Sequence, residues 1–555
     1  MAPVDRHRRQ ARTRPDPHRM HEQREQLMKT TTPDPFQTAL EQFQWPWWGT
    51  ALIIAVVVLA IAAAVWMVIR KAGSGAMDHL QSKMLHRNDI RAAKYPARRK
   101  EAVRLHPNAV GLAPGQQVGT LVHGGPIFQG WRDTCMALMG PGRGKTSGQV
   151  IPKMVNAPGA AMFTSRRIDG VREIIAGRPT STAWVFDPQR IYRKDTRPDF
   201  VFNPLMGIRT RDDADELAEI FETATKPKGA KTDAQFDPQG KSLLAFALLA
   251  AARTNKTLAD VHGWLNTETG GGEILDILER SGDPSAAMAM KGMEEQYDRT
   301  RKSVYATAQR MASALSNDQA MAWTNTSGIR RFDPETFVRS KDTLILLSKK
   351  GTAASSAFLT ALVRAVCKAA EQLAEDNGGR LETPFVVELD ECANVVKWPE
   401  LPDLYSYYGG YGIALSSYFQ SWAQGVKEFG AETMNAMWNA AGIRIYGGGE
   451  SAQGDFLRRL SDSVGTFKEV IKSYSAGSNN RSTSTSTQVR PIMTAGDLEG
   501  LPFWRAIVSV PGARPVLVKT TPWFRDKKLK ERIGDVKPAA RDVEETEEIR
   551  DVQPV

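Results

Sequence analysis

The chain has 555 residues, which is enough for two or three domains with complete hydrophobic cores. Apolar residues make up 41% of the sequence, so most of it is expected to fold. The three cysteines, Cys135, Cys367 and Cys392, are widely separated, which excludes a disulfide framework or a metal-ligand motif and fits a reducing cytoplasm. The net charge of +11 is unevenly distributed along the chain.

Residues 1–44 form a polar N-terminal segment that contains prolines and is expected to be disordered. It carries an arginine cluster at Arg6, Arg8, Arg9, Arg12 and Arg14. Met28 is an alternative starting residue, so the protein is expected to begin at either Met1 or Met28.

Residues 45–71 are predicted to be a transmembrane anchor. Within them, positions 49–69 are 21 residues without a charge, which as a helix spans a hydrocarbon core of about 30 Å. Trp45, Trp47, Trp48 and Trp66 flank this stretch as an interfacial aromatic belt would. The stretch is too long and too far from the N-terminus for a secretory signal peptide. A buried core helix is the alternative.

Residues 72–110 are predicted to be a basic juxtamembrane linker. Between positions 70 and 104, ten lysines and arginines are opposed by three carboxylates. The positive-inside rule places this side of the anchor in the cytoplasm, so we expect a single-pass membrane protein whose following domains are cytoplasmic. The basic segment could instead bind anionic lipid headgroups or nucleic acid.

A glycine-rich loop follows an apolar run at 134–138 and predicts a phosphate-binding site. It consists of Gly140, Pro141, Gly142, Arg143, Gly144, Lys145, Thr146 and Ser147. Its small residues let backbone N–H groups converge on phosphate oxygens, Lys145 reaches the β- and γ-phosphates, and the Thr146 hydroxyl ligates Mg²⁺. Met139 replaces the first glycine of the usual pattern, which is tolerable because the phosphates contact the later positions. The alternative is a glycine-rich turn with a chance Gly-Lys-Thr.

A second motif at 385–391, with the sequence FVVELDE, is an apolar strand that ends in two carboxylates. Asp390 can hold Mg²⁺ through water, and Glu391 can polarise the attacking water. The two motifs in this order predict a motor that binds ATP and Mg²⁺ and hydrolyses ATP.

Short apolar runs alternate with helical stretches, which predicts an α/β fold with a mostly parallel sheet and helices on both faces. Strands are expected at 160–164, 183–186, 343–348, 385–389, 413–418, 443–446 and 506–510. Residues 212–327 have helical patterns only, with helices expected at 213–223, 241–253, 258–265, 274–281 and 303–315. We interpret them as an all-α domain inserted into the sheet domain, whose two parts are residues 111–211 and 328–525.

Two later segments have biased compositions. Residues 473–487, with the sequence SYSAGSNNRSTSTST, are expected to be a mobile loop. Residues 526–555 are expected to be a charged tail, whose acidic run at 541–548 solubilises the protein or docks on a basic partner.

In chain order, these motifs resemble the coupling-protein ATPases of type IV secretion and bacterial conjugation. The resemblance covers about residues 45–525 and is most specific in LDECAN at 389–394 and FQSWAQ at 419–424. It implies a RecA-like motor domain with an all-α domain, an inner-membrane anchor and a homo-hexamer around a central channel. It also implies ATP-driven delivery of single-stranded DNA, with its attached relaxase, to a type IV secretion channel.

The resemblance matches Gln420 to a family glutamine that senses the γ-phosphate, which adds it to Glu391 and Lys145 as a catalytic residue. A buried amide that fixes a loop is the alternative for Gln420. Asn394 is expected either to position the strand at 385–389 or the attacking water, or to cap a helix. Lysines and arginines of the helical segment are candidate DNA contacts: Lys226, Lys228, Lys231, Lys241, Arg299, Arg301, Lys302 and Arg310.

Two features depart from the family. Relatives commonly have two membrane helices, whereas this chain has one clear span. Some relatives carry an arginine before the strand that precedes the glutamine, but residues 407–412 contain no basic residue. The candidates for an arginine that reaches the neighbouring subunit's nucleotide are Arg444, Arg458 and Arg459.

Three other functions compete with a DNA-transferring motor. A septal double-stranded DNA translocase typically carries a C-terminal winged-helix module, and the residues after Thr521 are too few for one. A membrane scaffold with a decayed ATPase is disfavoured by the intact Lys145, Thr146, Asp390 and Glu391. A secretion motor for protein substrates only has the same motor sequence and stays open.

Overall fold

The computed structural model describes residues 55–58, 77–84, 90–194, 197–226, 233–267, 270–349, 353–396, 398, 400–451, 454–476 and 481–538. The chain divides into two compact units, Met1–Ser74 and Gly75–Val555. In the first unit only residues 55–58 are described, and they are helical. The rest of the predicted anchor at 45–71 lies outside the described residues, as do the segment 1–44 and the acidic run 541–548.

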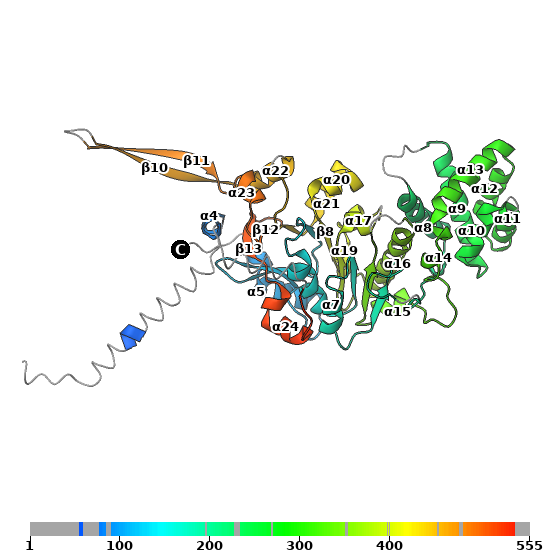
Figure 1. The fold of residues 1–555 in the computed structure, drawn as a ribbon, viewed down its shortest axis with the longest axis horizontal. Helices are drawn as coiled ribbons and strands as arrows, with labels where there is room; N and C mark the ends of the chain where they lie inside the picture. The colour runs from blue at the N-terminus through cyan, green and yellow to red at the C-terminus, as the bar shows by residue number, and fades with distance from the viewer. Residues whose placement is uncertain are drawn as a thin grey trace, which may run out of the picture. The chain divides into compact units, whose positions relative to one another are not determined.

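An 11-stranded sheet forms the core of the second unit (Figure 1). In spatial order its strands are β2 (Pro126–Gln129), β1 (Gln116–Leu121), β13 (Val516–Lys519), β12 (Arg505–Ser509), β9 (Ile443–Tyr446), β3 (Cys135–Leu138), β8 (Ile413–Phe419), β7 (Phe385–Leu389), β4 (Ala161–Ser165), β6 (Thr343–Leu347) and β5 (Ala183–Phe186). The seven strands from β9 to β5 are parallel. The α/β class and the mostly parallel sheet are therefore confirmed.

The other four strands extend the sheet in antiparallel fashion from β9 through β12, β13 and β1 to β2. The sequence analysis predicted β12 but missed β1, β2 and β13. β1 has the sequence QQVGTL, and β2 and β13 have only four residues each. Such short or polar runs acquire their strand character from pairing with a neighbour rather than from their own pattern.

Both faces of the parallel strands are covered, which explains why most of their residues are apolar. In β3, Met136 and Leu138 belong to one hydrophobic cluster, and Cys135 and Ala137 belong to the cluster on the other face. Helix α16 (Ala353–Asp376) supplies much of the first cluster and packs against α8 (Arg211–Thr225) and α15 (Pro334–Val338). It is long and apolar enough to cross a membrane, but 72% of its apolar stretch is buried inside the protein. It is therefore a core helix.

Between β5 and β6, residues 211–321 contain only helices among their described residues. After α8 come α9 (Phe236–Arg253), α10 (Leu258–Asn266), α11 (Gly270–Arg280), α12 (Pro284–Glu294), α13 (Asp298–Met311) and α14 (Asp318–Met321). Capping boxes at Thr210 and Thr257 begin α8 and α10. The sequence analysis missed α12, because five consecutive apolar residues at 286–290 obscure the helical spacing of its apolar positions. A separate domain at 212–327 stays a prediction, since residues from Gly75 onward form one compact unit.

The segment at 72–110 was predicted to be a linker, but its described part is folded. It contains α4 (Gln81–Met84) and α5 (Tyr95–Leu105), and its side chains bond to the sheet domain. Buried Asp78 pairs with Arg505 Nε at 2.8 Å, and Arg98 pairs with Asp133. The predicted tail likewise begins with a helix, α24 (Lys527–Ile533), which packs on α7 (Val171–Gly177) through buried Leu529 and Ile533. The charged composition of these two segments suggested a linker and a tail. It could not predict these contacts, because each of them depends on a few apolar or ion-paired side chains.

The predicted mobile loop at 473–487 is wrong for its described residues. β10 (Thr466–Ala476) and β11 (Arg481–Pro491) form an antiparallel two-stranded ribbon, which extends away from α22 (Asp455–Val464) and α23 (Ala495–Glu499) in Figure 1. The composition suggested a loop because serines dominate it. The threonines, which favour strands, alternate with those serines in STSTST at 482–487, and this period of two fits a strand.

Candidate nucleotide-binding site

The glycine-rich loop connects β3 to the π-helical segment η3 (Thr146–Val150) and α6 (Ile151–Val155). Gly142 and Gly144 have φ angles of 75° and 70°, which favour glycine. A Cβ atom on Gly144 would also lie 2.4 Å from the Trp504 ring. The loop is therefore held in a conformation that only glycine adopts without strain.

Met139, which replaces the usual first glycine, is buried in the protein interior. Its backbone N–H donates to the Phe419 carbonyl at 2.9 Å, and its side chain packs against Gly447. The next N–H, from Gly140, donates to the Gly448 carbonyl at 2.9 Å. The departure from the usual pattern thus anchors the start of the loop to β8 and to the segment after β9.

Arg143 also serves this anchoring rather than lying free at the mouth of the site. Its Nε donates to the Gly447 carbonyl at 3.1 Å, and its NH2 group donates to the Leu501 carbonyl. The loop residues from Gly140 to Ser147 nevertheless all line one cavity of about 280 Å³, together with Asp390, Glu391 and Gln420. The structure therefore brings together the residues predicted to bind the phosphates and Mg²⁺ and to act on the attacking water.

The first carboxylate after β7 meets the loop directly. Asp390 Oδ1 lies 2.6 Å from Lys145 Nζ, and Asp390 Oδ2 accepts a hydrogen bond from Thr146 Oγ1 at 3.2 Å. A hydroxyl and a carboxylate are hard oxygen ligands of the kind that Mg²⁺ takes alongside substrate phosphates. These donors fit a magnesium ion held between the loop and β7.

The second carboxylate, Glu391, has a left-handed backbone with φ 52° and ψ 42°. Its Oε1 accepts a hydrogen bond from Gln420 Nε2 at 3.0 Å, and its Oε2 pairs with Arg166 NH1 at 2.8 Å. Non-glycine residues rarely adopt this conformation, and such strain clusters at functional sites. Here it holds the carboxylate at the carboxyl edge of the sheet, between the strands that carry Arg166 and Gln420.

Arg166 and Arg167, which the sequence analysis missed, directly follow β4. Arg167 lines the cavity, as do Asp169 and Glu173 further along the chain. The sequence does carry a signal for these two arginines. They directly follow a buried strand, and ligands bind at the carboxyl ends of the strands in parallel α/β sheets. Asn394 lies inside helix α17 (Cys392–Val395), so the predicted helix cap at this residue is wrong.

A buried polar network joins β7 to β8 in the interior of the sheet domain. Tyr418 OH donates to Glu388 Oε2 at 2.5 Å, and Lys153 Nζ lies 3.8 Å from the same oxygen. Burial raises the pKa of Glu388 to about 7, although the Lys153 charge opposes this rise. The network fixes the register of the two strands that position Glu391 and Gln420.

The remaining basic candidates are not in this cavity. Arg444 and Arg459 line a second cavity, and Arg458 lies near Asp455 at 3.7 Å. In the helical segment, Arg310 pairs with Asp237 at 2.6 Å, and other candidates form ion pairs with carboxylates: Lys241, Arg301 and Lys302. Lys228 and Lys231 lie outside the described residues.

A glycine-rich loop after β3 and two carboxylates after β7, on a mostly parallel sheet, have the arrangement of a P-loop nucleotide-binding site. Residues 384–503 match the family model described as the TraM recognition site of TraD and TraG. A comparison with curated proteins gave no match.

Three solved structures of the bacterial conjugative coupling protein TrwB share the fold. The unbound monoclinic form of TrwBdeltaN70 has a TM-score of 0.54 and 14% identity, over 75% of this chain and 91% of that chain. The complex with ADP and Mg²⁺ has a TM-score of 0.53 and 15% identity, over 76% and 91%. The complex with the ATP analogue ADPNP has a TM-score of 0.51 and 14% identity, over 76% and 92%. The family model and this fold support the predicted place of the chain among the type IV coupling proteins.

Proposed function

We propose that the chain is a membrane-anchored coupling ATPase that delivers single-stranded DNA with its relaxase to a type IV secretion channel during conjugation. The observation that carries the proposal is the convergence of Lys145, Thr146, Asp390, Glu391 and Gln420 on one cavity. The TrwB fold and the match to the TraM recognition site of TraD and TraG support conjugation as the setting. A homo-hexamer around a channel belongs to the same proposal.

Each residue of the cavity has a distinct part in this function. Lys145 would neutralise the β- and γ-phosphates, and Thr146 and Asp390 would hold an Mg²⁺ ion that would offset charge on the transferred phosphoryl group. Glu391 takes the proton of the attacking water. Gln420, which directly follows β8 and bonds to Glu391, is placed to report the state of the site to β8 and to α20 (Trp422–Phe429).

Adding single-stranded DNA should raise the ATPase rate of the detergent-solubilised full-length protein, because a motor that moves on DNA couples hydrolysis to its track. DNA affinity should fall with salt at a log–log slope of about −0.7 per phosphate neutralised. ATPase assays and fluorescence anisotropy across a salt series measure both effects. An ATPase rate that DNA does not change, together with absent DNA binding, would favour the motor for protein substrates. Two candidate DNA contacts of the helical segment, Arg301 and Arg310, already pair with carboxylates, which also favours that motor.

We further propose that residues 45–71 anchor the protein in the inner membrane. Deleting residues 1–71 should give a soluble and mostly monomeric protein, because the anchor otherwise concentrates subunits in two dimensions. The deletion leaves the unit from Gly75 onward intact. Membrane flotation and light scattering measure the result. A deletion variant that still floats with membranes in high salt would contradict a single anchor.

A further inference from the structure

A second cavity, of about 760 Å³, lies away from the phosphate loop. It is bounded by α20, α21 (Ala431–Ala440) and α22, by β9 and β12, and by the turn that follows β12. Its volume lies within the range of small-molecule binding sites, which is about 300–1,000 Å³. It shares no described lining residue with the candidate nucleotide-binding cavity.

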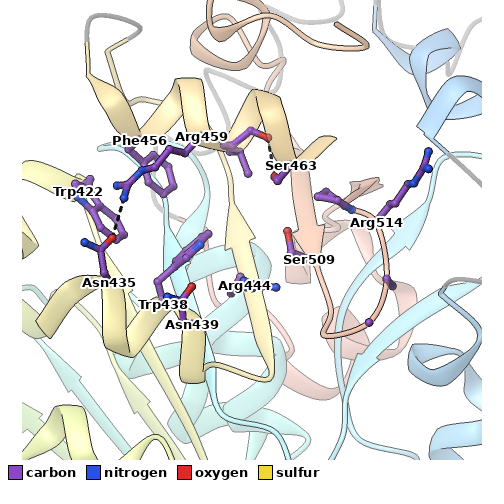
Figure 2. A pocket seen from close by; sticks show the side chains of 14 residues that line it. Trp422, Asn435, Trp438, Asn439, Arg444, Phe456, Arg459, Ser463, Ser509 and Arg514 are labelled. Carbon is purple, nitrogen blue, oxygen red and sulfur yellow. Dashed lines mark hydrogen bonds between the residues drawn. The ribbon is translucent and has the colours of Figure 1, made fainter. Parts of the chain in front are cut away.

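The lining of this cavity is strongly positive. Figure 2 shows Arg444 near its centre, between Trp438 and Ser509, with Arg459 toward one end and Arg514 toward the other. No aspartate or glutamate is among the described residues that line it. The cavity therefore presents three guanidinium groups without a lining carboxylate to neutralise them.

Arg444 is the most unusual of these groups. It lies at the start of β9, paired in register with Ser509 of β12, and its buried Nε has no hydrogen-bond partner among the described residues. Burial alone lowers the pKa of Arg444, with no carboxylate acting against it. An arginine stays charged in a protein, so this charge is only partly hydrated and unneutralised. An anion in the cavity would supply the missing partner.

Aromatic rings form the neighbouring wall. Trp422 stacks on Phe456 with ring centroids 4.8 Å apart, and half-buried Trp438 meets Phe456 edge to face at 5.3 Å. Arg459 lies over Trp422 and donates to Asn435 Oδ1 at 2.9 Å, which holds one guanidinium against the ring wall. This wall offers a flat apolar surface beside the positive charges.

We propose that this cavity is a second nucleotide-binding site, which takes a phosphate on its arginines and a base against Trp438. Arginine forks match phosphate oxygens, aromatic rings stack on bases, and the amides of Asn435 and Asn439 can bond to base edges. An acidic peptide would use the arginines but not the rings. The nucleotide unit comes either from a free nucleotide or from single-stranded nucleic acid, and both sources share this chemistry.

The test uses full-length protein in detergent and two probes, a fluorescent oligothymidylate and fluorescent AMP. Every protein carries Lys145→Ala, which removes nucleotide binding at the phosphate loop. Trp438→Ala should weaken the binding of whichever probe binds the cavity about tenfold. Arg514→Ala, at an exposed turn, should lower the salt slope for the oligonucleotide by about 0.7. Arg444→Gln should weaken binding about tenfold while it keeps the size and polarity of the side chain.

Lys427→Ala is the matched control, because this exposed lysine of α20 carries the same charge outside the cavity lining. Losses with the oligonucleotide alone identify nucleic acid as the source, and losses with AMP identify a free nucleotide. Unchanged binding in Trp438→Ala and Arg514→Ala, relative to Lys427→Ala, overturns the proposal. Competition by polyglutamate that is insensitive to Trp438→Ala overturns it in favour of an acidic peptide. Arg514→Ala and Trp438→Ala decide the outcome even if Arg444→Gln does not fold.

Discussion

Lys145→Ala should abolish nucleotide binding at the phosphate loop. Lys145 Nζ lies 2.6 Å from Asp390 in the structure, which places it at the mouth of the loop where the β- and γ-phosphates bind. Charge-assisted hydrogen bonds of this kind contribute about 1.5–3 kcal/mol each, so losing them should weaken ATP binding by about 100-fold or more. Titration with a fluorescent ATP analogue in the presence of Mg²⁺ measures the change.

The control for this variant is Lys427→Ala, which removes a lysine of α20 that is exposed and outside the loop. The control should bind ATP like the unaltered protein, and both variants should melt at the same temperature. ATP binding by Lys145→Ala within about threefold of the control, well short of the loss expected for a charge-assisted bond, would remove Lys145 from the phosphate site.

Glu391→Gln should keep nucleotide binding and nearly stop turnover. Glutamine has the shape of glutamate and can still accept a hydrogen bond from Arg166 or Gln420, but it cannot take a proton from water. General base catalysis contributes about 10²–10⁴-fold, so kcat should fall by that factor. Steady-state ATPase assays, combined with the binding titration used for Lys145, separate the two effects.

Glu432→Gln is the matched control, because this exposed glutamate lies in the first turn of α21 and does not line the cavity. Its ATPase rate should match that of the unaltered protein. A Glu391→Gln variant that hydrolyses ATP at a rate close to this control would assign the base to another residue of the cavity. Asp169 and Glu173, which also line it, would then be the carboxylates to test.

The two predictions together distinguish the roles of adjacent parts of one site. Lys145 contacts the phosphates as soon as ATP binds, whereas Glu391 is needed only when a water molecule attacks the γ-phosphate. Loss of binding and loss of turnover should therefore occur in different variants. If both variants lose binding, Glu391 maintains the structure of the site, through its bonds to Arg166 and Gln420, rather than acting on the water.

Local sequence determined much of the motor, because its signals need no distant partner. A buried parallel strand is mostly apolar, since both of its faces are covered, so β4, β5, β6, β7, β8 and β9 were predictable from short, mainly apolar runs. The phosphate loop was predictable because close approach of backbone to phosphate requires small residues around a lysine. Asp390 and Glu391 stood out as charges at the end of such a strand.

Only the tertiary structure decided the features that depend on residues far apart in the chain. The Arg166–Glu391 pair joins residues 225 positions apart, and the order of strands at the carboxyl edge brings them within 2.8 Å. Strands β1, β2 and β13 exist because each pairs with a neighbour, and the ribbon of β10 and β11 exists because two polar strands satisfy each other's backbone groups. The charge of Arg444 is unneutralised because the described elements packed around it bring no carboxylate to the cavity lining. The spacing of residues along the sequence does not predict which elements will surround it. Periodicity and motif spacing report what each segment buries or binds, whereas pairing and charge balance are set by the packing of segments against one another.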